Sequence, residues 1–250
     1  MTLDLAASLR HARALWRADR AILWPLSGLL IFLPQYAVLL LIPPMPASAP
    51  GATVETWGKA LEPWIASYGA WYVAVAAIGQ FGALAIVSLY ALPPRTAGGA
   101  LARALLLFPR LLLASAVVMI PCAAALLLAL SVPLAPLVAI PALVYVLART
   151  ALVGPIITGD RRTGAVAAVV RSWRLTQGHG LQIALLVGAI MVGGQALGTI
   201  AVTIEQAVRA GAFSNPVLLA MIDAVAAAAA WAAALALALV EVVLYRRLVR

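Results

Sequence analysis

The segment DRRTGAVAAVVRSWRLTQGHG, at positions 160–180, is the part of the chain that decides the fold. Apolar residues recur in it at the spacing i, i+3, i+4 and i+7, which places them on one face of a helix. These residues are Val166, Val169, Val170 and Trp173. Arg171 and Arg174 flank this face, and a long apolar run begins at Leu181. The pattern is typical of a basic amphipathic helix that lies in a membrane interface and leads into a membrane span, with its arginines among lipid phosphates.

The ends of this predicted helix have suitable residues. Thr163 can cap the N-terminus, and Gly178 and Gly180 can end the helix. The alternative interpretation is a solvated loop, whose positive charges would serve only to keep this segment on the correct side of the membrane.

Two other segments have the same character. In 2–20, arginines gather on one side of a predicted helix and apolar residues on the neighbouring side. The arginines are Arg10, Arg13, Arg17 and Arg20, and the apolar residues are Leu5, Leu9, Ala12 and Trp16. In 96–108, a weaker copy, Leu101, Leu105 and Phe108 form the apolar side beside Arg103. We therefore expect one membrane domain, 1–250, with a threefold helix-hairpin repeat whose units are 1–92, 93–157 and 158–250.

The composition indicates a membrane protein. The chain has 250 residues, of which 65% are hydrophobic and only 10% charged, and its mean hydropathy is +1.07. A soluble domain would carry about a quarter charged residues. A nucleic-acid-binding protein could share the net charge of +9, but it would need those charges on a polar surface. Here they lie beside apolar runs, which predicts anionic lipid headgroups as partners and no nucleic acid.

The apolar runs predict an all-α, polytopic protein with six transmembrane helices. The expected spans are 26–42, 68–92, 109–130, 133–153, 181–204 and 217–245. A break at Trp24-Pro25 and a polar, Pro-rich loop over 43–67 are expected around the first span. The run 111–155 is too long for one crossing of about 20 residues, so we expect it to turn at 131–136. The region 205–216 is expected to be a short outer loop.

The basic residues predict the orientation. With these spans, 15 of the 17 Lys and Arg residues lie on one side, and only Lys59 and Arg209 lie on the other. Cytoplasmic loops of membrane proteins are enriched in Lys and Arg. Both termini are therefore expected in the cytoplasm, which requires an even number of spans.

A few polar residues and glycines lie within the spans. Gly194 and Gly198 form a GxxxG pattern, which favours close packing of the last two helices, although a lipid or substrate groove is the alternative. Asp223 is a carboxylate about 9 Å inside the membrane. It is a functional candidate, but it could also pair with Arg209. Gln80 and Gln195 are expected to donate hydrogen bonds between helices.

Two further residues are expected to be structural. Glu241 could pair with Arg246 or with Arg149. The single cysteine, Cys122, lies in an apolar run and is expected to be a small buried residue.

Catalytic and metal-binding motifs are absent from the sequence. The two histidines, His11 and His179, each lie beside arginines, and neither has a second ligand at helical spacing. There is no HExxH, GxSxG or P-loop motif. We therefore expect no enzyme activity, no metal and no cofactor.

The chain resembles a bacterial membrane-domain family. The segment RSWRLTQGH at 171–179, Gly154-Pro155 before it and YRRL at 245–248 are similar to the YciC-like group. This group is related to the N-terminal membrane half of some glycerophosphoryl diester phosphodiesterases. The likeness covers essentially the whole chain, but the soluble catalytic domain with its His-Arg-Gly signature has no counterpart here. The resemblance therefore implies a bacterial inner-membrane protein and carries no activity across.

The sequence thus leads to two functional hypotheses. The first is a non-catalytic membrane protein that binds anionic lipids, a membrane partner or a second copy of itself through its basic interfacial helices. The residues expected to hold and anchor the headgroups are Arg10, Arg13, Arg17, Arg171, Arg174, Trp16 and Trp173. The second is a small transporter or channel subunit that uses Asp223, Gln80 and Gln195, which would need a polar cavity at the midplane. A membrane enzyme would need several acids to converge in space.

Overall fold

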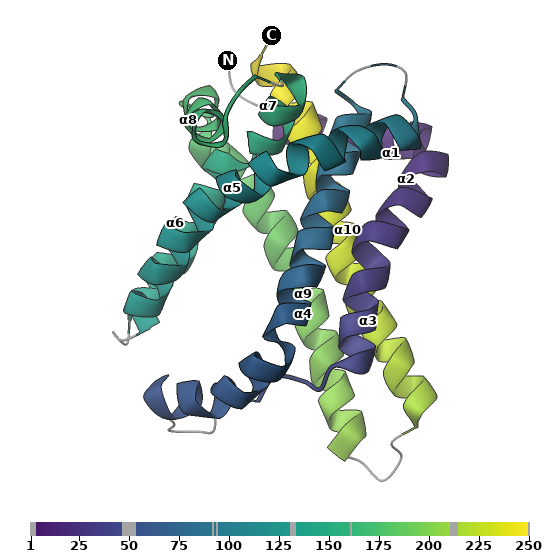
Figure 1. Cartoon of the computed structure of the whole chain (residues 1–250), viewed down its shortest axis with the longest axis vertical. Helices are drawn as coiled ribbons and strands as arrows, with labels where there is room; N and C mark the ends of the chain where they lie inside the picture. Colours follow the sequence, from purple (N-terminus) through teal and green to yellow (C-terminus); the bar gives the residue numbers. More distant parts are fainter. Residues whose placement is uncertain are drawn as a thin grey trace.

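The predicted all-α membrane architecture is confirmed. The computed structural model describes residues 4–46, 54–91, 93, 95–130, 134–160, 162–210 and 215–249. All regular elements in these ranges are helices, and six of the resulting segments are long and apolar enough to cross a membrane. Figure 1 shows them as an elongated bundle with both chain ends at the same end.

The helices follow one another along the chain without any strand in the described ranges. They are α1 (Leu5–Ala18), α2 (Arg20–Ser27), the π-helical segment η1 (Gly28–Phe32), α3 (Leu33–Leu41), α4 (Val54–Leu89), α5 (Ala97–Leu130), α6 (Ala135–Thr150), α7 (Val153–Gly159), α8 (Ala165–Leu175), α9 (Gly180–Ala210) and α10 (Pro216–Leu248). The first crossing combines α2, η1 and α3, and the fourth combines α6 and α7. The other four crossings are α4, α5, α9 and α10.

Helix α10 is the centre of the bundle. It contacts α9 along much of its length and also packs against α1, α3, α4, η1 and α7. Its C-terminal half is buried, from Leu235 through Leu244 on the sides that face these helices. Because this part of α10 is made mostly of Ala, Leu and Val, several helices can approach it closely.

One glycine of the GxxxG pattern makes the predicted close contact between α9 and α10. A Cβ atom on Gly194 would lie 2.6 Å from the Cβ of Ala233 on α10. A Cβ on Gly198 would meet nothing within 4 Å. The two helices therefore approach each other at Gly194, and the second glycine is not needed for the contact.

In the hairpin of α5 and α6, helix α5 packs much less than the other crossings. Only 6% of the most apolar stretch of α5 is buried inside the protein, compared with 44% of the corresponding stretch of α10. Figure 1 shows this hairpin slanting away from the other spans. Large apolar side chains such as Leu113, Ile120 and Leu128 are exposed along it. In a membrane these side chains face lipid.

The first crossing begins earlier than predicted, and the expected break at Pro25 is wrong. The chain interrupts its helix at Asp19, and α2 continues through Pro25. Proline lacks the N–H needed for a helical hydrogen bond. The π-helical segment Gly28–Phe32 follows within one turn, which is a usual way for a helix to absorb a local change of register.

The loop expected over 43–67 is also partly wrong, because α4 begins at Val54. Figure 1 shows that the first turns of α4 bend away from the rest of the helix. Two indole N–H groups tie this part to the preceding segment, since Trp57 donates to the carbonyl of Pro46 (3.2 Å) and Trp64 donates to that of Pro43 (3.1 Å). The Pro-rich composition suggested a loop because these contacts cannot be read from local sequence.

Three other helix ends differ from the sequence prediction. Gly164, not Thr163, is the N-cap of α8, because the Thr163 hydroxyl donates to the Asp160 carboxylate (2.9 Å). Gly178 has a left-handed backbone (φ +83°) after α8, as its predicted terminating role requires, whereas Gly180 begins α9. Helix α9 continues to Ala210, through half of the region expected to be an outer loop.

The repeat stays a prediction. Helices α1 and α8 are separate helices that precede a span, but 97–108 is simply the first part of α5, which continues through Pro109. The turn expected at 131–136 lies partly outside the described residues.

Gly194 offers a direct test of how the last two helices pack. In Gly194→Ala the new methyl group would overlap Ala233, and overpacking of this kind typically costs about 1–3 kcal/mol. Gly198→Ala has open space and is the matched control. We expect reversible unfolding in mixed detergent to show a loss of stability for Gly194→Ala only. Equal stability of the two variants would contradict the close contact.

Candidate functional site

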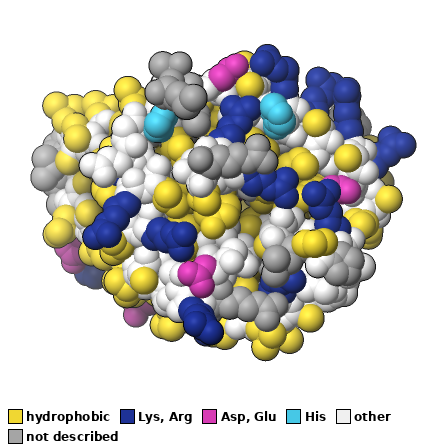
Figure 2. Space-filling model, turned by 90° about the horizontal axis from the view of Figure 1, so that it is seen from above, with side chains coloured by type: hydrophobic (Ala, Val, Ile, Leu, Met, Phe, Trp, Pro, Cys, Tyr) yellow, Lys and Arg dark blue, Asp and Glu magenta, His cyan; other side chains and the backbone are white. Residues whose placement is uncertain are grey.

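Arginines gather at the end of the bundle where the two chain ends lie. Figure 2 views this end from above and shows Lys and Arg side chains spread over it among hydrophobic ones. We call it the arginine-rich end. It is defined by the arginines of α1 and α8 and of the helix ends and connections beside them, namely Arg10, Arg13, Arg17, Arg20, Arg95, Arg103, Arg149, Arg162, Arg171, Arg174, Arg246 and Arg247. These arginines divide into one set that holds helices together and another that is exposed.

Arg149 is the most buried member of the first set. Its side chain extends from the last turn of α6, with 6% of the residue exposed. Its guanidinium donates to the carbonyls of Trp173 (2.7 Å) and Thr176 (2.8 Å), at the C-terminus of α8. It also lies 4.7 Å from the centre of the Trp173 ring. A cation at a helix C-terminus satisfies free carbonyls and opposes the negative end of the helix dipole.

Ser172 completes this junction between α6 and α8. Its hydroxyl donates to the carbonyl of Arg149 (2.8 Å) and accepts from the N–H of Leu152 (3.2 Å). Ser172 and Ala168 are the buried residues of α8. This narrow buried face therefore fixes α8 against the bundle. The other faces of α8 remain available for contacts outside the bundle.

A second junction surrounds Tyr90, just after α4. Arg246 donates to the Tyr90 carbonyl (2.9 Å), and Arg103 donates to the carbonyl of Ser88 (3.2 Å). The centre of the Tyr90 ring lies 5.3 Å from the guanidinium carbon of Arg95 and 5.7 Å from that of Arg246. Burial, followed by the nearby Asp19 carboxylate, raises the pKa of Tyr90, so its hydroxyl remains protonated.

A third junction attaches α1 to the end of α10. Arg247 donates to the carbonyl of Asp4 (3.2 Å) and to the hydroxyl of Ser8 (3.2 Å), and it lies 3.2 Å from Nδ1 of His11. The carboxylate of Asp4 caps α1 by accepting from the N–H of Ala7 (2.9 Å), and this hydrogen bond lowers the pKa of Asp4. Helix α1 is therefore held in place from one side.

The opposite side of α1 carries exposed arginines. Arg10, Arg13 and Arg17 surround a shallow depression whose floor is formed by Ala14 and Ala18. Arg10 makes an exposed ion pair with Asp4 at 3.7 Å, a type of pair that contributes little. The described residues offer Arg13 and Arg17 no carboxylate within 4 Å. Three cationic side chains therefore lie around this one depression.

An apolar groove adjoins this depression. It has a volume of about 410 Å³ and lies between α1 and α10. Arg13 lines both the groove and the depression. Trp16 from α1 and Trp231 from α10 line the groove, together with Leu9, Ala12, Ala232, Leu235, Ala236, Leu239 and Val240. Basic and apolar surfaces thus meet along one face of α1.

Helix α8 presents an amphipathic surface away from the bundle. Val166, Val170 and Trp173 are exposed, while Val169 is half-buried. Arg174 is exposed beside them, and Arg171 makes an exposed ion pair with Asp160 at 3.6 Å. Hydrogen bonds from Arg162 N–H and from the Thr163 hydroxyl lower the pKa of Asp160. The apolar face predicted from the sequence is therefore formed. Val166 and Val170 point outward, whereas the exposed Trp173 ring also contacts the Arg149 guanidinium.

The intramembrane polar residues lie in three different surroundings. Asp223 is 3% exposed and interacts with Glu205, which is bound by Arg209 at 2.6 Å. The sequence left a pairing of Asp223 with Arg209 open, and the ion pair of Arg209 is with Glu205. Sequence reasoning missed Glu205 because it assigned this position to a loop. The pattern of an acid and a base four residues apart on a longer α9 could have revealed the pair.

The glutamines do not join Asp223. The Gln80 side chain accepts a hydrogen bond from Ser115 of α5 (3.2 Å), so it links two helices, although as an acceptor rather than as the expected donor. Gln195 is exposed on α9, and the predicted interhelical hydrogen bond is not formed in the described part of the chain. Glu241 pairs with neither Arg149 nor Arg246 among the contacts of the described residues, and it lines a cavity instead.

The described residues contain no group of three or more His, Cys, Asp or Glu side chains that could hold a metal ion. Cys122 is half-buried, so it is less enclosed than expected. No family model, curated protein or solved structure matches this chain. The resemblance to the YciC-like group therefore stays a prediction, and the function has to be argued from the geometry.

Arg149 is the residue whose loss we expect to damage the arginine-rich end most. Arg149→Met keeps the apolar stem and leaves the carbonyls of Trp173 and Thr176 without their charged donor. Hydrogen bonds to charged groups contribute about 1.5–3 kcal/mol each. We expect reversible detergent unfolding to show a loss of about 3–6 kcal/mol for the two hydrogen bonds, and Arg162→Met, at an exposed site of the same end, to change little. A loss of similar size in both variants would argue against a specific junction.

Proposed function

We propose that this protein is a non-catalytic, multi-pass protein of a bacterial inner membrane that binds anionic lipids at its arginine-rich end. The observation that carries the proposal is the depression on α1, where Arg10, Arg13 and Arg17 meet an apolar groove at Arg13. A lipid has the same two parts, a charged headgroup and apolar chains, joined at one point.

The headgroup phosphate would occupy the depression. Arg presents several N–H donors in a planar fork that matches phosphate oxygens. Ala14 and Ala18 leave space for the phosphate between the arginines, and larger side chains there would fill it. The acyl chain would then follow the groove past Trp16 and Trp231, where the rings offer apolar surface at the level of the interface.

Helix α8 would provide a second contact with the same leaflet. Its outward residues Val166, Val170 and Trp173 would enter the boundary between headgroups and acyl chains, with Arg171 and Arg174 among the phosphates. Arg149 already fixes α8 against α6, so the helix need not become ordered on binding. A preorganised surface binds more tightly because less conformational entropy is lost.

The proposed orientation places the arginine-rich end and both termini in the cytoplasm. Lys59 and Arg209 are the two basic residues assigned to the opposite side. The inner leaflet is negatively charged, and each arginine near it contributes about 1 kcal/mol of attraction. The orientation and the lipid site therefore support each other. A transporter is less well supported, because Asp223, Gln80 and Gln195 do not line a common path.

The α1 site can be tested by removing two charges that have no carboxylate partner in the described chain. We expect Arg13→Gln/Arg17→Gln to weaken binding of phosphatidylglycerol about 30-fold, from about 2 kcal/mol of lost attraction. Binding would be measured by native mass spectrometry of the detergent-solubilised protein titrated with the lipid.

The matched control is Lys59→Gln/Arg162→Gln, which removes the same net charge from exposed sites outside the depression. It should leave phosphatidylglycerol binding within about threefold of the unmodified protein, and neither variant should alter binding of phosphatidylcholine. Equal weakening by both double variants would show attraction by net charge alone and would overturn the site on α1.

A further inference from the structure

A separate cavity lies inside the bundle, below the arginine-rich end. Its volume is about 290 Å³, near the lower limit for small-molecule sites. Side chains from α4, α5, α6, α7, α9 and α10 line it, and most are apolar, as in the case of Leu84, Leu111 and Leu237. Met119 of α5 lines the cavity and is also 45% exposed. The cavity therefore reaches the lipid-facing surface of the loosely packed helix α5.

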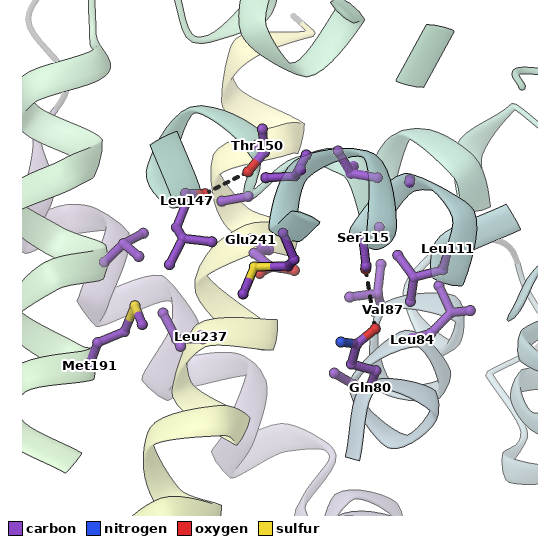
Figure 3. A pocket seen from close by; sticks show the side chains of 18 residues that line it. Gln80, Leu84, Val87, Leu111, Ser115, Leu147, Thr150, Met191, Leu237 and Glu241 are labelled. Atoms are coloured by element: carbon purple, nitrogen blue, oxygen red, sulfur yellow. Dashed lines mark hydrogen bonds between the residues drawn. The ribbon is translucent and has the colours of Figure 1, made fainter. Parts of the chain in front are cut away.

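Among the described residues that line this cavity, Glu241 is the only acid. Figure 3 shows its carboxylate directed from α10 into the space between the Leu147–Thr150 turn and the Gln80–Ser115 pair. The Glu241 side chain is half-buried and opens onto this cavity. It makes no hydrogen bond or ion pair with another described residue. An ionisable side chain placed without a partner inside a membrane protein is costly, and such residues commonly mark a binding site.

The other polar groups of the cavity already have partners. The Ser115 hydroxyl donates to the side-chain oxygen of Gln80, and the Thr150 hydroxyl donates to the carbonyls of Val146 and Leu147. The amide nitrogen of Gln80 is on the side away from Ser115 in Figure 3. The lining thus offers one carboxyl group without a described partner and a large apolar wall. A metal cation such as Ca²⁺ would require six or more oxygen ligands, which this lining does not provide.

The cavity is also close to the polar interface. Glu241 precedes Arg246 by five residues, or about 7 Å along the axis of α10. A ligand entering past Met119 can therefore keep a charged group near the interface while its chain remains in the apolar region.

We propose that this cavity binds an amphipathic primary amine, whose ammonium group pairs with Glu241 and whose hydrocarbon chain contacts the apolar wall. The ammonium would supply the missing partner, and the pair would be stabilised by the low dielectric of its surroundings. Two sources share this chemistry, namely a free alkylamine and the headgroup of an aminophospholipid from the bilayer. The site is distinct from the depression on α1 and does not depend on it.

The test uses octylamine as the probe and octanol as its uncharged counterpart. The whole protein would be placed in phosphatidylcholine nanodiscs, and binding of radiolabelled probe would be measured by equilibrium dialysis against empty nanodiscs. We expect saturable octylamine binding that Glu241→Gln weakens at least tenfold, while octanol binds equally weakly to both proteins. Asp223→Asn, which removes the other acid on α10, should leave octylamine binding unchanged.

A second variant tests the cavity without altering the carboxylate. A Cβ on Gly154 would lie 3.8 Å from Oε2 of Glu241, so Gly154→Leu would place a side chain in the space of the proposed ammonium. It should also abolish saturable octylamine binding. Equal binding of octylamine and octanol, or full octylamine binding by Glu241→Gln, would overturn the proposal.

A final arm distinguishes the two sources of amine. Nanodiscs that contain phosphatidylethanolamine should compete with octylamine if the headgroup enters the cavity, which would support a lipid ligand. Saturable octylamine binding that this lipid does not reduce would support a free amine. Both results support the proposal only together with octylamine binding that Glu241→Gln weakens.

Discussion

Guanidinium groups that donate to backbone carbonyls hold the arginine-rich end of this protein together. Every α-helix leaves carbonyls unsatisfied at its C-terminus, and water cannot satisfy them where several helices pack together. Arg149 binds the carbonyls at the end of α8, while Arg103 and Arg246 bind those at the end of α4. Because one guanidinium carries five donors, it can join two elements. Arg149 thereby holds α8 beside the bundle, and Arg247 holds α1 in the same way through the carbonyl of Asp4.

The arginines therefore perform two tasks that composition alone does not separate. Buried or half-buried ones such as Arg149 and Arg246 are used within the protein. Exposed ones such as Arg13 and Arg17 are displayed by helices that the first set has fixed. A net charge of +9 overstates what is available to lipid, because several of those charges already have carbonyl partners. The surface around the exposed arginines of α1 combines cations with an apolar groove, and this combination supports the proposal of lipid binding.

The sequence predicted the parts that depend on local periodicity. The six crossings follow from apolar length, and the faces of α1 and α8 follow from helical spacing. Of the GxxxG pair, only Gly194 meets α10, since a Cβ on Gly198 would have no atom within 4 Å. The partners of Arg149 lie 24 and 27 residues away, and Glu241 lines a cavity formed by six helices, so neither could be inferred from neighbours in the chain. The start of α4 was missed because its Trp57 and Trp64 contacts are tertiary.

The most direct test of the account is the side of the membrane that the arginine-rich end faces. Cys122 would be replaced by Ser, and single cysteines would be introduced by Ala14→Cys on α1 or Lys59→Cys on α4, both at exposed positions. A membrane-impermeant maleimide would then be applied to intact spheroplasts. The account predicts that Lys59→Cys is labelled at once, and that Ala14→Cys is labelled only after the membrane is permeabilised. Labelling of Ala14→Cys in intact spheroplasts, with Lys59→Cys protected, would contradict it.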